Sequence, residues 1–226
     1  MSPLFITGIG TGVGKTLVSA IVAEALDAYY WKPVQAGFAE GTDAEWVGAR
    51  LSPRPAGVGG DAKRTGGERV LPEAYKLKLP ASPHIAAREE GLVIRVEDLA
   101  ERMPAVRPLV VEGAGGLLVP LNEGQFMTDL AVALDATVVL VSRNYLGSIN
   151  HSLLTAEVCR MRGLTVAGWI FNDQYGDYEE EIVRWSGYPK LGSVPFSAEP
   201  DAAFVRGQAG RLRAVLTATA KGAAAR

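Results

Sequence analysis

The chain of 226 residues contains little cysteine and little histidine, one of the first and two of the second. The lone Cys159 excludes a disulfide within the chain and a metal cluster held by cysteines, and it fits a reducing compartment. His84 and His151 lie far apart, and neither has a second ligand at a spacing typical of metal sites. We therefore expect each histidine to cap or pack near the start of a helix.

The sequence also lacks a strong charge of one sign and a long hydrophobic run. Its net charge of −2 gives no electrostatic reason to expect a nucleic acid or an anionic membrane as partner. No apolar run approaches the length of a membrane span, and the N-terminus leads into a strand pattern rather than a signal peptide. These features predict a soluble, cytoplasmic protein with no nucleic-acid or membrane partner.

What the sequence does contain is a regular alternation of short apolar segments and helical patterns. Apolar residues make up 48% and charged residues 21%, as in ordinary globular proteins. Nearly continuous apolar strands separated by helices predict an α/β fold with a doubly wound, mainly parallel sheet and helices on both faces. Strands are expected at 3–7, 29–34, 107–113, 136–142, 165–172 and 191–195, and helices at 15–30, 43–51, 82–91, 127–135, 149–163 and 177–185.

The length suits a single domain, which we expect to cover residues 1–226. Within it, a Gly/Arg-rich stretch at 52–70 is predicted to be a surface loop, and 220–226 a frayed tail. The acidic run at 177–181 is typical of the solvated first turn of a helix, and the aromatic residues at 29–31 of a strand core. In such sheets ligands bind beyond the carboxyl ends of the strands, where the motifs described next all lie.

The first motif, TGIGTGVGKT at residues 7–16, joins an expected strand to an expected helix. The strict phosphate-loop pattern needs a glycine five places before Gly14, but Ile9 stands there. The order of strand, glycines, GKT and helix still supplies backbone N–H groups and a helix N-terminus that face a phosphate. Lys15 would reach the phosphates and Thr16 would bind Mg²⁺, which favours a P-loop NTPase-like fold over a plain glycine-rich turn.

Two carboxylates and a second lysine follow other expected elements. Glu112 ends an apolar strand, and the glycines after it allow a phosphate to approach closely; a strand-terminal charge in a turn is the alternative. Asp43 opens a helix, where taken alone it is typical of an N-cap. Lys32 ends the second strand, either as a solvated charge or, if that strand lies beside the first, as a cation facing the γ-phosphate.

Eight motifs follow one another along residues 3–200: TGIGTGVGKT, KPVQAG, TDAEW, SPHIAAREEG, VEGAGGLLVPL, LGSINHSLLTAE, GWIFND and LGSVPF. In this order and spacing they closely resemble the dethiobiotin synthetase family. Single motifs are shared with other ATPases, but KPVxxG, SPH, VEGAGG and LGxINHxLLT are specific when they occur together. The family's own loop has the same offset glycine, so the resemblance implies that Ile9 is compatible with a working phosphate loop.

The resemblance implies an ATP-dependent enzyme of biotin biosynthesis that converts 7,8-diaminononanoate and CO₂ into dethiobiotin, releasing ADP and phosphate. One amine would take up CO₂ as a carbamate, the carbamate would attack the γ-phosphorus, and the second amine would displace phosphate. Such catalysis depends on positioning and charge neutralisation rather than on a covalent nucleophile. The resemblance also implies Mg²⁺ as cofactor and a homodimer with the substrate site near its interface.

Residue roles follow from the same resemblance. Thr16, Asp43 and Glu112 would bind Mg²⁺, and Lys15 and Lys32 would be catalytic. The amide of FND would read the adenine, since it both donates and accepts hydrogen bonds, although alone it is typical of a turn. The full nucleotide set is Gly12, Val13, Gly14, Lys15, Thr16, Leu17, Asp43, Glu112, Gly113, Ala114, Gly115, Asn172, Asp173, Pro195, Phe196, Ser197 and Asp201; the substrate set is Thr11, Lys32, Ala36, Gly147 and Asn150.

Two positions depart from the family pattern. Gly10 stands where the family usually has Asp, and Ala36 stands where KPVxSG supplies a serine hydroxyl. The loss of one neutral hydrogen bond costs on the order of 1 kcal/mol, which is about fivefold in affinity. We therefore expect weaker substrate binding rather than loss of activity.

Two other functions remain as alternatives. A nucleotide-switch ATPase acting on a protein partner shares the expected fold, but such proteins carry a signature lysine early in the loop, where this chain has Gly10. An ATP-dependent amide-forming enzyme of the cobyrinate type commonly adds a glutamine-hydrolysing domain with a cysteine nucleophile. Cys159, in contrast, lies inside a helical pattern.

Overall fold

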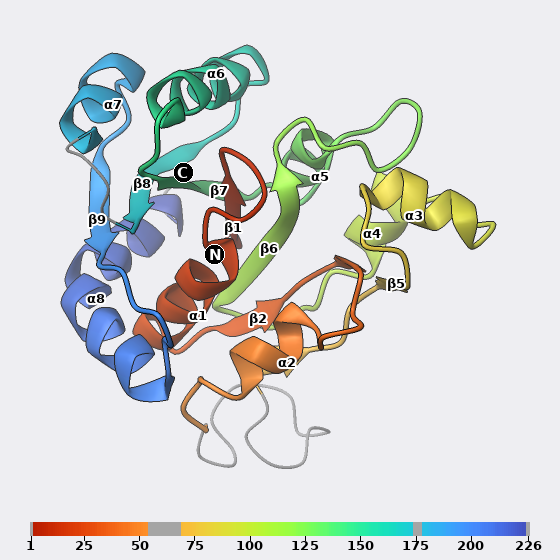
Figure 1. Ribbon diagram of the computed structural model, residues 1–226, viewed down its shortest axis with the longest axis horizontal. Coiled ribbons are helices and arrows are strands. Elements are labelled where there is room, and N and C mark those ends of the chain that lie inside the picture. The colour runs from red at the N-terminus through yellow and green to blue at the C-terminus, as the bar shows by residue number, and fades with distance from the viewer. Residues whose placement is uncertain (1, 54–68, 174–177, 225–226) are drawn as a thin grey trace.

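The centre of the computed structural model, which describes residues 2–53, 69–173 and 178–224, is a seven-stranded sheet (Figure 1). Its strands are β1 (Leu4–Gly8), β2 (Tyr29–Trp31), β4 (Val70–Leu71), β6 (Leu109–Gly116), β7 (Thr137–Arg143), β8 (Val166–Asn172) and β9 (Lys190–Val194). They lie in the order β4-β2-β6-β1-β7-β8-β9, and every neighbouring pair is parallel. A second, two-stranded parallel sheet pairs β3 (Val34–Ala36) with β5 (Tyr75–Leu77).

Helices cover both faces of the large sheet. They are α1 (Lys15–Ala25), α2 (Asp43–Gly48), α3 (Pro83–Glu89), α4 (Val96–Glu101), α5 (Met127–Ala133), α6 (Ser148–Met161), α7 (Glu179–Ser186) and α8 (Ala202–Ala224). Because strand side chains alternate between the faces, Tyr30 joins the core with α1, α2 and α8, whereas Tyr29 and Trp31 join the core with α3 to α7. The predicted doubly wound α/β fold is confirmed. No described helix is long and apolar enough to cross a membrane.

The segment at 29–34, predicted as one strand, forms parts of two sheets. β2 ends at Trp31, and β3 begins the small sheet two residues after Lys32. Pro33 lies at the break because it has no N–H to donate to a ladder, while its carbonyl accepts the N–H groups of two residues at the start of β5. The break leaves Lys32 beyond the carboxyl end of β2.

The order of the strands corrects the reasoning about Lys32. That reasoning required β2 to lie beside β1, but β6 stands between them. Lys32 nevertheless reaches the edge of the sheet near the glycine loop, because β2 pairs in register with β6, Trp31 opposite Val111, and Glu112 is the next residue of β6. The lysine thus meets the carboxylate of the intervening strand.

Two predicted boundaries are wrong in the described residues. The surface loop at 52–70 ends before residue 70, since Val70 begins β4 and Arg69 is buried; residues 54–68 lie outside the described residues. The tail at 220–226 is helical as far as Ala224, and 225–226 lie outside the described residues. α8 was not predicted, because its glycines weaken the helical pattern, and β4, β5 and α4 are too short for periodicity to reveal.

The first turn of α7 is less solvated than predicted. Glu179 is buried, and its Oε2 accepts hydrogen bonds from Lys190 and Ser193 of β9. Both histidines lie near the start of a helix, as expected. His84 is within 3.1 Å of the Ser82 hydroxyl, and His151 within 2.7 Å of the Tyr145 hydroxyl.

Candidate active site

The glycine loop turns between β1 and α1 with its residues packed against β8. Gly14 has φ = 87°, and a Cβ atom there would lie 2.0 Å from the side-chain nitrogen of Asn172. Asn172 in turn donates from that nitrogen to the Val13 carbonyl, at 3.1 Å. Glycine is thus required both for the left-handed backbone and for the close approach of Asn172. No side chain caps α1, so its first N–H groups are available to an anion.

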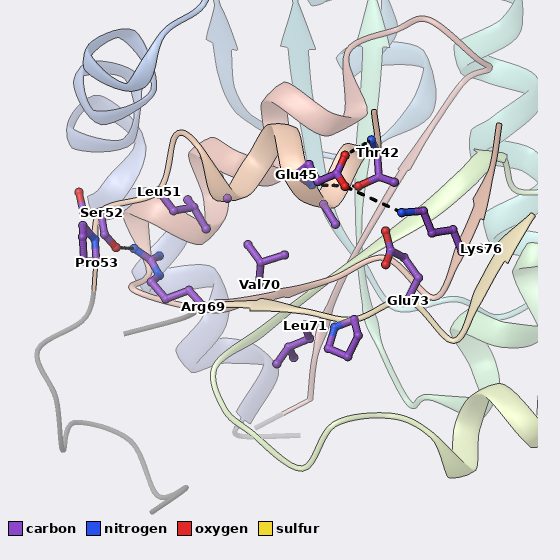
Figure 2. Close-up of a pocket in the computed structure, with 13 residues that line it drawn as sticks. Thr42, Glu45, Leu51, Ser52, Pro53, Arg69, Val70, Leu71, Glu73 and Lys76 are labelled. Atoms are coloured by element: carbon purple, nitrogen blue, oxygen red, sulfur yellow. Dashed lines mark hydrogen bonds and ion pairs between the residues drawn. The ribbon is translucent and has the colours of Figure 1, made fainter. Parts of the chain in front are cut away.

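A hydroxyl and two carboxylates meet beside this loop. The Thr16 Oγ1 lies 3.0 Å from Asp43 Oδ1 and 2.9 Å from Glu112 Oε1. The position of Asp43 alone favoured an N-cap role, but Asp43 does not cap α2. Thr42 is the cap instead, in a capping box with Glu45 (Figure 2), which leaves the Asp43 carboxylate directed at Thr16 and Lys32.

The donor set of this meeting point suits a hard cation. All three side chains offer oxygen, and Mg²⁺ is typically bound by few protein oxygens, with phosphates and waters supplying the rest. Among the described residues no group of three or more His, Cys, Asp or Glu could hold a metal ion by itself. Thr16, Asp43 and Glu112 therefore fit a Mg²⁺ that is bound together with a polyphosphate.

The two lysines of the site differ in their surroundings. Burial lowers the pKa of Lys15 to about 8, although Glu112 opposes this, and its ammonium donates to the Gly10 carbonyl at 2.7 Å. Burial also lowers the pKa of Lys32, but the charges of Glu112 and Asp43 outweigh it, so that this pKa lies above its ordinary value. The Lys32 ammonium contacts both carboxylates, Glu112 Oε1 at 2.9 Å.

Tyr30 is a site residue that sequence reasoning missed. Its phenol is buried under α1 and donates to Glu112 Oε2 at 2.9 Å. Burial, together with the charge of Glu112, raises the pKa of Tyr30 well above its ordinary value. The strand pattern correctly predicted a core residue, and the only further signal was that a fully buried tyrosine must find a partner for its hydroxyl.

A cavity of about 770 Å³ extends from these groups along the glycine loop. Of the predicted residues it gathers Thr11, Gly12, Gly14, Lys15, Thr16, Lys32, Ala36, Asp43, Glu112, Ala114 and Gly115. It adds Val34, Gln35, Val119 and residues 80–83, which had been given no role. The SPH motif was a signal for the last of these, since Ser82 and Pro83 belong to it.

A second cavity, of about 660 Å³, lies on the other side of the loop. Thr11, Gly12, Val13, Asp173 and Phe196 of the predicted sets line it, together with Arg143, Asn144 and Tyr145, which were not predicted. Asp173 pairs with Arg143 at 2.8 Å. This cavity adjoins Asn172, the residue expected to read adenine.

The remaining predicted residues line neither cavity. Asp201 precedes α8, and its carboxylate accepts the N–H of Phe204 at 2.8 Å. At Gly113 a Cβ atom would lie 2.9 Å from the Phe5 ring, which gives this glycine a packing role. The others are Leu17 in α1, Pro195 and Ser197 after β9, and Gly147 and Asn150, both exposed at the start of α6.

Solved structures of similar fold include an ATPase of the ParA family and cell division proteins. A chain of the MinC:MinD cell division protein complex of Aquifex aeolicus matches with a TM-score of 0.59 and 15% identity, covering 100% of this chain and 96% of that one. The ParA family ATPase of Chlorobium tepidum matches with a TM-score of 0.54 and 12% identity, covering 96% and 92%. Identities this low establish a common fold alone.

Sequence relatives are much more similar. A family model described as an AAA domain matches residues 2–203. ATP-dependent dethiobiotin synthetases of Rhodopseudomonas palustris, Novosphingobium aromaticivorans and Brucella abortus are 46%, 44% and 43% identical to the chain. The alignments cover 90%, 89% and 86% of this chain and 90%, 91% and 86% of the relatives. With these relatives and the loop, lysines and carboxylates gathered at one edge of its sheet, the chain belongs to the dethiobiotin synthetase family.

Proposed function

We propose that the protein is an ATP-dependent cyclo-ligase that converts 7,8-diaminononanoate and CO₂ into dethiobiotin, with ADP and phosphate as the other products. The observation that carries this proposal is the cavity in which Lys15, Lys32, Asp43 and Glu112 adjoin the glycine loop. A reaction between two anions needs such a site, because cations must neutralise both the carbamate and the phosphates.

The reaction proceeds in three steps. One amine of the substrate adds to CO₂, forming a C–N bond and releasing a proton, and the product is a carbamate. A carbamate oxygen then attacks the γ-phosphorus, and ADP leaves. The second amine attacks the carbonyl carbon of this mixed anhydride, and phosphate leaves as the ring closes and the amine loses its proton.

The side chains of the cavity act by binding and orienting. Lys15 and the first N–H groups of α1 hold the phosphates, while Lys32 holds the carbamate near them. Thr16, Asp43 and Glu112 bind Mg²⁺, which supplies positive charge to the phosphate oxygens when bound. Lys32 is suited to its task because it is buried and its raised pKa keeps it charged at neutral pH.

The adenine is assigned to the region around the end of β8. Asn172 braces the glycine loop through its nitrogen, which leaves its side-chain oxygen to accept from the adenine amino group. Asp173 and Phe196 line the cavity there, Phe196 with 66% of its surface exposed and hence accessible to a flat ring. Pro195, Ser197 and Asp201 flank the same ring in this proposal.

The active assembly is proposed to be a cytoplasmic homodimer. Gly147 and Asn150 line neither cavity of their own chain, and they are exposed at the start of α6. Leu146 and Leu154 beside them are 87% and 57% exposed. A second copy covering these leucines would bury apolar surface and bring Gly147 and Asn150 to the carboxylate of the bound diamine.

The test is phosphate release from Mg-ATP with and without 7,8-diaminononanoate plus bicarbonate, with the organic product followed by mass. We expect release to depend on both additions, and the product to exceed the diamine by one carbonyl in place of two hydrogens. ATP binding without diamine-dependent release would contradict the proposed substrate and favour the switch or amide-forming alternatives.

A further inference from the structure

The side chain of Tyr30 connects the middle of β2 to the middle of β6, which continues beyond Glu112 to Gly116. Tyr30 stands opposite Val110 in the parallel pairing of these strands, and Val110 and Glu112 point to the same face because they are two residues apart. The phenol therefore extends along the sheet toward its carboxyl edge, where it meets Glu112 at 2.9 Å. Tyr30 is fully buried there.

The two oxygens of Glu112 have separate partners. Oε1 contacts Thr16 and Lys32, each at 2.9 Å, on the side of the cavity. Oε2 contacts Tyr30, on the side of the core. An ionised carboxylate only accepts hydrogen bonds, so the phenol is the donor, and rotation of the carboxylate would break the contacts of both oxygens.

We propose that Tyr30 is a positioning residue of the cation site: its hydroxyl holds Glu112 so that Oε1 faces Thr16 and the metal. The inference rests on the proposed function only in assigning Thr16, Asp43 and Glu112 to a divalent cation. Groups that orient a metal ligand through its second atom typically change metal affinity by about 10- to 100-fold when removed. Without the phenol, Oε2 of Glu112 is buried with no hydrogen-bond donor. We then expect the carboxylate to rotate so that Oε2 reaches Lys32 or Thr16, which changes the orientation of Oε1.

The variant Tyr30→Phe removes the hydroxyl and keeps the ring that packs under α1. Mn²⁺ serves as the probe, and its affinity in the presence of ADP is measured by electron paramagnetic resonance. We expect Mn²⁺ to bind about tenfold more weakly than in the wild type, while ADP binding in EDTA, measured by calorimetry, is unchanged. If Tyr30 had only a structural role, Tyr30→Phe would weaken the binding of Mn²⁺ and of metal-free ADP alike.

Tyr29→Phe is the matched control, because this neighbouring phenol belongs to the core on the opposite face of the sheet. We expect it to leave Mn²⁺ affinity unchanged. A second control combines Tyr30→Phe with Glu112→Gln. If Tyr30 acts through Glu112, Tyr30→Phe has little further effect on Mn²⁺ affinity in the Glu112→Gln background. Equal effects in the two backgrounds would overturn the proposal.

Two further results would overturn it. One is unchanged Mn²⁺ affinity in Tyr30→Phe; the other is a parallel loss of thermal stability, metal-free ADP binding and Mn²⁺ binding. Binding of Mn²⁺ and ADP requires neither diamine nor CO₂. Either result would therefore overturn the role of Tyr30 without contradicting ring closure. Failure of ring closure, in turn, leaves the expected effect of Tyr30→Phe in place.

Discussion

Lys15 and Lys32 carry the same charge at the same edge of the sheet, but their pKa values are shifted in opposite directions. Burial dominates at Lys15, whose ammonium donates to a backbone carbonyl. At Lys32 the two carboxylates outweigh burial. A lysine held by Asp43 and Glu112 offsets part of their charge, and the same ammonium is the cation nearest to where the carbamate is proposed to lie.

Replacing Lys32 by glutamine tests this role at the scale of a residue. We expect Lys32→Gln to retain Mg-ATP binding, because the carboxylates and the loop remain, and to lose turnover by about 100-fold, since a cation facing developing charge is removed. Phosphate release gives the turnover and calorimetry the binding. Lys78→Gln is the control, because Lys78 is exposed and outside the cavity. Unchanged turnover in Lys32→Gln would remove this residue from the mechanism.

At the scale of elements, buried Arg69 holds together the segments that precede β4. It donates to the carbonyls of Ala23 and Ala28 around the end of α1, and to the Ser52 carbonyl at 3.1 Å (Figure 2). Its charge is paired with Glu24 of α1 at 2.8 Å. This arrangement places the short β4 at the edge of the sheet, beside β2.

The variant Glu24→Gln tests the pair. At Glu24, hydrogen bonds from Ser52 and the charge of Arg69 outweigh burial and hold the pKa below its ordinary value of 4.5. We expect the variant to lower the free energy of unfolding by about 3 kcal/mol at pH 7, because buried Arg69 then loses its close partner and keeps only the half-exposed Asp27, 3.8 Å away, as a counter-charge. Urea denaturation measures the free energy of unfolding. Glu101→Gln is the control, because Glu101 is exposed.

The pH dependence of this effect has a definite sign. A carboxylate whose pKa is lowered by folding stabilises the protein fully above its unfolded-state pKa, and this contribution is lost as pH falls through the folded-state value. The difference between wild type and Glu24→Gln should therefore be constant above pH 4.5 and shrink below it. A difference that grows toward acidic pH would contradict the assignment.

At the scale of the whole molecule, the site lies at the edge of the sheet where β1 and β2 end, beside Glu112 in the middle of β6. The chain leaves β1 through α1 for β2 and later returns through β6, which pairs with β1. In open parallel sheets such an edge, with successive connections leading to opposite sides, is the usual place of a ligand. Groups distant in sequence, such as Thr16 and Glu112, are brought to 2.9 Å in this way.

Because the site joins several strands and helices, a nucleotide should stabilise the whole fold. Mg-ADP at about 100 times its dissociation constant adds about 2.7 kcal/mol, which for a chain of this length raises the thermal midpoint by about 5 °C or more. With EDTA we expect a clearly smaller shift, since Asp43 and Glu112 then repel the phosphates. Scanning calorimetry makes the comparison, and equal shifts with and without the metal would argue against a cation at Thr16, Asp43 and Glu112.

Sequence periodicity and local motifs were sufficient for the fold class and for most of the elements. The spacing of apolar residues along the chain predicts a strand or a helix in any fold, because secondary structure of this kind depends on neighbours in the sequence. The glycine loop was likewise recognisable, since strand, glycines and helix are contiguous. The proposed roles of Lys32 and Asp43, in contrast, came from the family resemblance, because local pattern alone is as typical of a solvated charge for Lys32 and of an N-cap for Asp43.

What the sequence by itself determined, then, is the alternation of most strands, loops and helices and the polar residues that stand near their ends. Only the tertiary structure decided that β6 lies between β1 and β2, that the carboxylate of Asp43 meets Thr16 and Lys32, and that Tyr30 meets Glu112. Strand pairing and side-chain contacts join residues far apart in the chain. They are selected by packing of the whole core, which no local pattern records.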